Sequence, residues 1–135
     1  MVNLKLVSKK PMEASKSFTE LVVWQKAHQF VLKTYVLTQR FPKEEMYGLS
    51  SQFRRAALSI AANIAEGFAR RGARDKCRFL NISQSSLQEC RYFLILSRDL
   101  NYQTDATLNN LADDIAKLLN SYISAIKRRP PIFNS

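Results

Sequence analysis

Cysteine, glycine and proline are scarce in this chain of 135 residues, which holds two, three and four of them. So few chain-bending residues favour a small number of long helices over a fold of many short strands. Cys77 and Cys90 fit no zinc-ligand spacing, and on a single helix they would point to different faces. We therefore expect two reduced thiols and no disulfide.

Long apolar runs are also missing. No segment approaches the roughly 18 consecutive apolar residues of a membrane helix. The N-terminal residues 1–17 carry no continuous apolar stretch of signal-peptide length. These absences predict a cytoplasmic protein with no membrane partner.

Histidine occurs once, at His28, which excludes a metal site built from several histidines. Gln25 stands where the Glu-x-x-His motif of di-iron bundles would need a glutamate. The sequence has no glycine-rich phosphate loop and no nucleophile elbow. We expect no metal, no cofactor and no enzymatic activity, and we interpret His28 as a packed core or interface residue.

Negative charge is in short supply, because 21 lysines and arginines face 11 acidic residues. The formal net charge is +10 and the isoelectric point is near 10.0. Such an excess favours association with polyanions such as RNA, DNA or an acidic protein surface. The alternative is a basic protein that its charge merely keeps in solution.

Apolar residues recur every three or four positions, as on one face of a helix. Ser17 and Glu20 fit a capping box that opens the first helix, and Thr104 suits the cap of the last. The expected helices cover residues 17–40, 49–68, 73–99 and 104–129. Short connections make neighbours antiparallel, so the sequence predicts an all-α, up-down-up-down antiparallel four-helix bundle. The domain then spans residues 18–129, with a basic flexible arm at 1–17 and a tail at 130–135.

Two basic clusters are candidate nucleic-acid contacts. The denser one lies at the corner between the second and third helices, and the other ends the fourth helix. Arginine forks match the geometry of phosphate, whereas a solvated basic loop is the plain alternative. The candidate residues are Arg70, Arg71, Arg74, Lys76, Arg78, Lys127, Arg128 and Arg129.

A second set of residues is interpreted as structural or as part of a subunit interface. Arg54 and Arg55 could contact phosphate, but we favour ion pairs with Glu44, Glu45 or Glu66, or with a neighbouring subunit. Asn63 and Glu66 stand among apolar residues, which predicts a buried hydrogen bond that fixes helix register. Trp24 occurs at helical spacing and is interpreted as core rather than as a base-stacking platform.

Three segments carry a resemblance to a known family. They are LVVWQKA at 21–27, FPKEEMYGLSSQ at 41–52 with RRAA at 54–57, and SIAANIAEG at 59–67 followed by Arg70-Arg71 and RFL at 78–80. Together they resemble the four-helix bundle protein family, also called the 23S ribosomal RNA intervening-sequence protein family, over about residues 18–102. The chain departs from the family pattern in the third helix, at Gly72, Lys76, Ser85 and Arg91.

The resemblance implies a compact bundle that assembles as a ring of five, and some family members are encoded inside insertions in ribosomal RNA genes. The family is also similar in structure to the accessory variability protein of diversity-generating retroelements, a basic pentameric bundle that binds a reverse transcriptase and its RNA. Our leading hypothesis is a homo-oligomer, sealed by leftover apolar residues of the first two helices, that binds RNA. The alternative is a protein adaptor whose partner is a reverse transcriptase or a ribosome-associated component.

Overall fold

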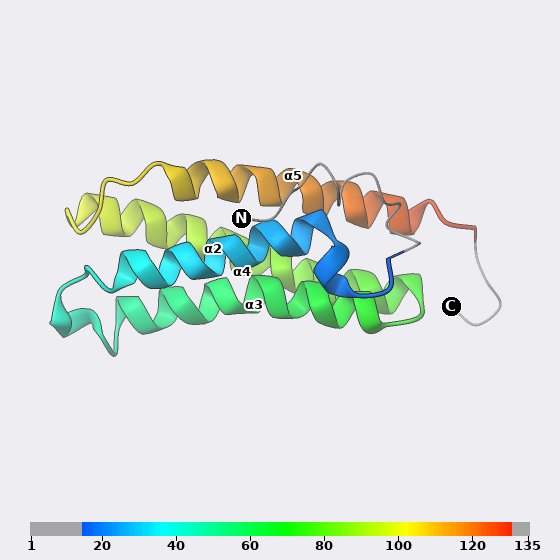
Figure 1. The fold of residues 1–135 in the computed structure, drawn as a ribbon, viewed down its shortest axis with the longest axis horizontal. Helices are drawn as coiled ribbons and strands as arrows, with labels where there is room; N and C mark the ends of the chain where they lie inside the picture. The colour runs from blue at the N-terminus through cyan, green and yellow to red at the C-terminus, as the bar shows by residue number, and fades with distance from the viewer. Residues whose placement is uncertain (1–14, 131–135) are drawn as a thin grey trace.

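The computed structural model describes residues 15–130, which form helices joined by short connections and contain no β-strand (Figure 1). The predicted arm and tail lie outside the described residues, apart from residues 15–17 and Pro130. The elements, in chain order, are η2 (Phe18–Glu20), α2 (Val22–Thr38), η3 (Lys43–Glu45), α3 (Leu49–Ala69), α4 (Ala73–Asp99) and α5 (Thr107–Lys127).

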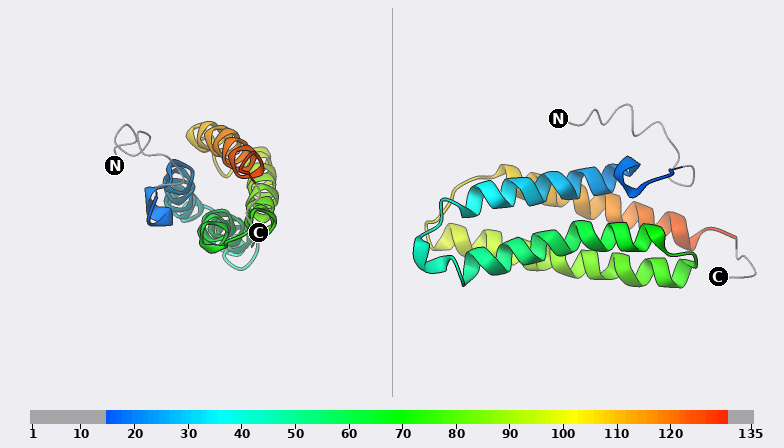
Figure 2. Two further views of the ribbon diagram at one scale, coloured as in Figure 1. Left: turned by 90° about the vertical axis from the view of Figure 1, so that its right-hand side faces the viewer. Right: turned by 60° about the horizontal axis from the view of Figure 1, so that its bottom comes forward.

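The four α-helices run up, down, up and down around one core, which confirms the predicted fold class (Figure 2). Helix α2 packs against α3 and α5, and α4 packs against the same two helices. Helices α2 and α4 therefore occupy diagonal corners of the bundle. Their outward faces lie on opposite sides of the molecule.

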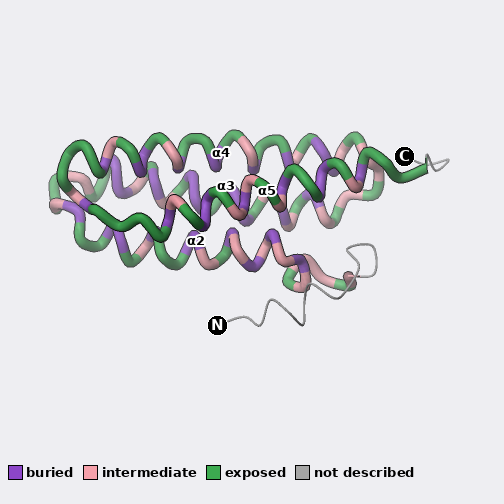
Figure 3. Tube along the Cα trace, turned by 90° about the horizontal axis from the view of Figure 1, so that it is seen from above, coloured by how far each residue is buried: buried purple, intermediate pink, exposed green. Residues whose placement is uncertain are grey.

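Each helix turns an apolar face toward the core and leaves its opposite face exposed to solvent (Figure 3). The rings of Phe53 on α3 and Phe93 on α4 meet in the core with their centroids 5.7 Å apart. The largest fully buried side chains come from all four helices and include Phe30, Phe53, Ile60, Leu80, Leu94, Leu108, Ile115 and Ile126.

Small residues let α3 and α4 approach closely along their length. Ala57 and Ser83 are fully buried between helices, and the Ser83 hydroxyl donates a 2.9 Å hydrogen bond to the Ile60 carbonyl. At Gly67 a Cβ atom would lie only 3.2 Å from the carbonyl oxygen of Lys76. These small side chains therefore let α3 and α4 form a tight helix pair.

Two helix starts differ from the prediction. The Ser17 hydroxyl accepts a bond from the Thr19 amide and opens the short turn η2, so the first α-helix begins only at Val22. Thr104 does not cap the last helix. The Asp105 carboxylate instead accepts bonds of 2.8 and 2.7 Å from the amide and hydroxyl of Thr107, where α5 begins.

Helix α4 spans Ala73–Asp99 as predicted, and Cys77 and Cys90 on it are buried and unbonded. None of the helices described is long and apolar enough to cross a membrane.

Candidate nucleic-acid interface

The antiparallel arrangement brings the two basic clusters to one end of the bundle. The end of α3, the start of α4 and the end of α5 meet there, at the right of Figure 1. Lys127 of α5 lines the same groove as Arg74 and Arg78 of α4. Segments about 50 residues apart in the sequence thus contribute to one basic surface, which the sequence analysis treated as two.

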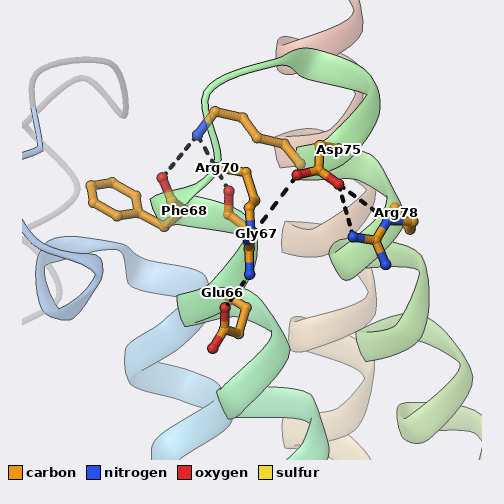
Figure 4. A network of polar contacts seen from close by, with 7 residues as sticks. Glu66, Gly67, Phe68, Arg70, Asp75 and Arg78 are labelled. Carbon is orange, nitrogen blue, oxygen red and sulfur yellow. Dashed lines mark hydrogen bonds and ion pairs between the residues drawn. The ribbon is translucent and has the colours of Figure 1, made fainter.

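Lys76 is buried in this corner and does not belong to the exposed surface. Its Nζ donates hydrogen bonds to the carbonyl oxygens of Phe68, at 2.9 Å, and Gly67, at 3.3 Å (Figure 4). Burial lowers the pKa of Lys76, and the nearby charge of Arg129 lowers it further. Lys76 therefore satisfies the Phe68 carbonyl at the end of α3 and adds a second donor to the Gly67 carbonyl, which also accepts a 3.2 Å hydrogen bond from the Arg70 amide.

Arg70 and Arg78 are both held by neighbouring carboxylates (Figure 4). Arg70 pairs with Glu66 at 2.8 Å and approaches Asp75 at 4.0 Å. Arg78 donates to one oxygen of Asp75 from Nε at 3.1 Å and from Nη2 at 2.9 Å. The Phe79 ring lies against both guanidinium groups, with centroid distances of 4.5 Å to Arg70 and 4.4 Å to Arg78. These contacts fix the orientation of two arginines that remain open to solvent.

The other cations at this end have no such partners. Their side chains are exposed and make no hydrogen bond or ion pair with any residue in the range 15–130. They are Arg71, Arg74, Lys127, Arg128 and Arg129. Because no carboxylate of residues 15–130 pairs with them, this end carries most of its described positive charge on exposed side chains that are accessible to a polyanion.

A groove of about 870 Å³ runs between the first turns of α4 and the end of α5. Arg74, Arg78 and Lys127 line it together with the smaller side chains of Ala73 and Cys77. It therefore combines a charged rim with uncharged surface.

Arg54 joins α2 to α3 rather than pairing with a carboxylate. Its Nε donates to the Thr38 hydroxyl at 2.7 Å, and its guanidinium lies 4.8 Å from the centroid of the Tyr35 ring. Arg55 is exposed and lines a groove between α3 and α4 with Ser59 and Glu89. Neither arginine forms the predicted ion pairs with Glu44, Glu45 or Glu66 in the part of the chain described.

Asn63 takes part in a polar link between α3 and α4. Its Nδ2 donates to the carbonyl and hydroxyl oxygens of Ser59, and the Ser59 hydroxyl bonds to that of Ser86 at 2.8 Å. Glu66, by contrast, is exposed, so the expectation that it sits among apolar side chains was wrong. Its carboxylate faces Arg70 at the surface.

Trp24 is half-buried at the start of α2. Its ring meets Phe18 edge-on at 5.1 Å and stacks on His28 at 5.0 Å with an interplanar angle of 7°. His28 itself is exposed, so within this chain it is not a core residue.

Large apolar side chains stand exposed on the diagonal helices α2 and α4. Leu32 and Val36 of α2 are 54% and 53% exposed, and Tyr92 and Ile95 of α4 are both 58% exposed. We call these pairs the α2 patch and the α4 patch. The sequence predicts exposed apolar residues on the first two helices but not those on α4, because helical spacing alone does not say which side of a helix is left uncovered.

Within residues 15–130 no three histidine, cysteine, aspartate or glutamate side chains are grouped to hold a metal.

Comparison with protein families matches residues 19–124 to the family described as 23S rRNA-intervening sequence protein. Among solved structures, the chain is similar to a protein from the S23 ribosomal protein family of Bacteroides thetaiotaomicron VPI-5482. The two are 31% identical, the match covers 76% of this chain and 96% of that one, and the TM-score is 0.70. The chain matches no curated protein.

Proposed function

The chain belongs to the 23S rRNA-intervening sequence protein family, and from this membership we propose that it is a cytoplasmic, non-enzymatic homo-oligomer, a pentamer, that binds RNA through phosphate contacts. The observation that carries the proposal is the set of exposed, unpaired cations at one end of the bundle, Arg71, Arg74, Lys127, Arg128 and Arg129. Phosphates would meet these side chains without displacing an ion pair formed within residues 15–130.

Phosphate contacts of this kind give affinity without sequence readout. The opposite end of the bundle also carries exposed cations, Arg40, Lys43 and Arg98, but acidic residues adjoin two of them in the sequence, Glu44 beside Lys43 and Asp99 beside Arg98. Arg70 and Arg78 add charge that is already oriented, since Glu66, Asp75 and Phe79 hold them in place.

The α2 patch and the α4 patch support the oligomer. Two different apolar patches on the diagonal helices α2 and α4 suit a head-to-tail contact, in which the α2 patch of one copy meets the α4 patch of the next. Such a contact closes into a ring when the rotation between neighbouring subunits divides a full turn, and otherwise it extends into a filament. In a ring of five, the basic end occurs five times on one assembly, and several weak contacts to one RNA then add to its avidity.

Salt-dependent binding of a labelled RNA hairpin, followed by fluorescence anisotropy, tests the proposal. We expect affinity to fall steeply between about 50 and 200 mM salt, because released counterions drive phosphate binding. Changing Arg71, Arg74 and Arg128 together to glutamine should flatten the log–log slope by about two to three. Arg40, Arg55 and Arg98 changed together to glutamine remove the same charge elsewhere and should leave most of the slope intact.

An affinity that barely responds to salt would refute the proposal, as would an equal loss in both triple variants. The adaptor hypothesis makes a different prediction. After nuclease treatment the protein would still capture a single protein partner, a reverse transcriptase or a ribosomal component, and would show no affinity for RNA.

A further inference from the structure

The end groove has features that phosphate binding alone does not need. Its volume of about 870 Å³ lies within the range of small-molecule sites. Part of its wall is the side chains of Ala73 and Cys77, which can neither attract nor orient a phosphate. A ligand that fills it should therefore have an uncharged, flat or compact part as well as an anionic one.

Arg78 lines this groove in a fixed orientation. Two of its nitrogens donate to Asp75, and its guanidinium carbon lies 4.4 Å from the centroid of the Phe79 ring. The side chain nevertheless remains 62% exposed. A planar group that is stacked and hydrogen-bonded in this way loses little freedom when a second flat group packs against it.

The carboxylate in the groove does not oppose an anion strongly. Asp75 lines the groove, but it is held by Arg78 and lies 4.0 Å from Arg70. The unpaired cations Arg74 and Lys127 stand at the same groove. The local balance therefore favours a ligand with phosphate groups.

We propose that the end groove holds one unpaired nucleotide of a single-stranded RNA. The base stacks on the guanidinium of Arg78 beside Ala73 and Cys77, and the flanking phosphates contact Arg74 and Lys127. Arginine planes and aromatic rings are common stacking partners of unpaired bases, whereas the bases of a duplex are stacked on one another and out of reach. The inference rests on the proposed function and adds to it a preference for unpaired nucleotides.

The test compares two labelled probes of equal length and charge, an oligouridine and an abasic oligoribonucleotide, at one salt concentration. We expect the oligouridine to bind about tenfold more tightly, the typical contribution of one stacked base. Arg78→Lys keeps the charge but removes the plane, so it should abolish this difference and leave the abasic probe's affinity unchanged. Arg98→Lys, an exposed arginine at the far end of α4, is the matched control and should preserve the difference.

Ala73→Met provides a second variant, which fills the groove without altering any charge, and its far-ultraviolet circular dichroism reports whether it folds. It should weaken oligouridine binding as Arg78→Lys does. Equal binding of the two probes to the unaltered protein would overturn the nucleotide groove while leaving phosphate binding intact. Failure of both probes to bind would overturn the groove and the proposed function together.

Discussion

At the scale of the residue, the basic corner separates cations that stabilise the fold from cations that remain free. Lys76 is buried and bonds to the carbonyls of Gly67 and Phe68, whereas Arg74, two positions earlier, is exposed and unpaired within the described chain. The burial that lowers the pKa of Lys76 also makes its ammonium unavailable to a ligand. Neighbours in one basic run therefore have different roles.

Lys76→Met tests this division. The change removes the Nζ donor from the Phe68 carbonyl and one of the two donors to the Gly67 carbonyl, so we expect the free energy of unfolding to fall by about 1–2 kcal/mol. Urea denaturation measures this loss. Lys117→Met, the same change at an exposed site on α5, should have little effect on stability.

The folded Lys76→Met protein should also bind the RNA hairpin as the unaltered protein does. A selective loss of RNA affinity, with stability unchanged, would return Lys76 to the binding surface and contradict its assignment as a helix cap.

The sequence predicted where the charged residues cluster better than it predicted which of their side chains are exposed to a ligand. The run from Arg70 to Arg78 could be recognised as basic from the sequence, but the burial of Lys76 depends on how α4 turns back on α3. Glu66 follows a run of apolar residues in the sequence, which suggested an apolar environment for its carboxylate. Helical geometry instead turns the side chain outward toward Arg70. Contacts between elements, rather than local pattern, decide both cases.

At the scale of the element, the pairing of α3 with α4 depends on Gly67. Replacing glycine by alanine inside a helix usually gains about 1 kcal/mol. Here the added Cβ would lie 3.2 Å from the Lys76 carbonyl oxygen and 3.3 Å from the Leu80 side chain. The backbone oxygen belongs to a rigid helix and cannot easily yield.

We therefore expect Gly67→Ala to lower the free energy of unfolding by about 1 kcal/mol despite its better helix propensity. Thermal and urea denaturation measure the effect. Ala62→Gly, at an exposed site of the same helix, supplies the propensity difference in the absence of crowding. If Gly67→Ala stabilises the protein by the amount that Ala62→Gly destabilises it, the close approach of the helices costs nothing at this position.

Helix interiors could be predicted from the sequence, whereas two of the helix starts could not. The limits of α4 follow from the glycine before it and the turn after it, and both signals are local. The start of α5 depends on Asp105, which accepts two bonds from Thr107, although threonine, present at Thr104, is also a preferred capping residue. Similarly, Ser17 caps the short turn η2 and not α2. The extended conformation of Leu21 separates the two, so α2 begins only at Val22.

At the scale of the whole molecule, the exposed apolar residues and the basic end occupy different parts of the surface. The α2 patch and the α4 patch lie on the sides of the bundle, and the unpaired cations lie at one end. A ring built through the sides would therefore leave the basic ends uncovered. We therefore expect that the proposed assembly and the proposed RNA binding can each be removed without the other.

Mixing two single variants distinguishes a head-to-tail ring from symmetric pairing. Leu32→Glu destroys the α2 patch and Tyr92→Glu destroys the α4 patch, and each change places a charge at an exposed position that leaves the core intact. We expect each variant alone to be monomeric by light scattering, because every head-to-tail contact needs both patches.

Combined in equal amounts, the two variants still have one intact α2 patch and one intact α4 patch on different chains. They should form a one-to-one heterodimer that cannot grow, because its two outer patches are the altered ones. If each patch instead paired with its own kind, each variant alone would retain a dimer through its intact patch, and mixing would produce nothing new. That result would refute the ring, whereas a heterodimer that forms only on mixing would establish the direction in which the subunits join.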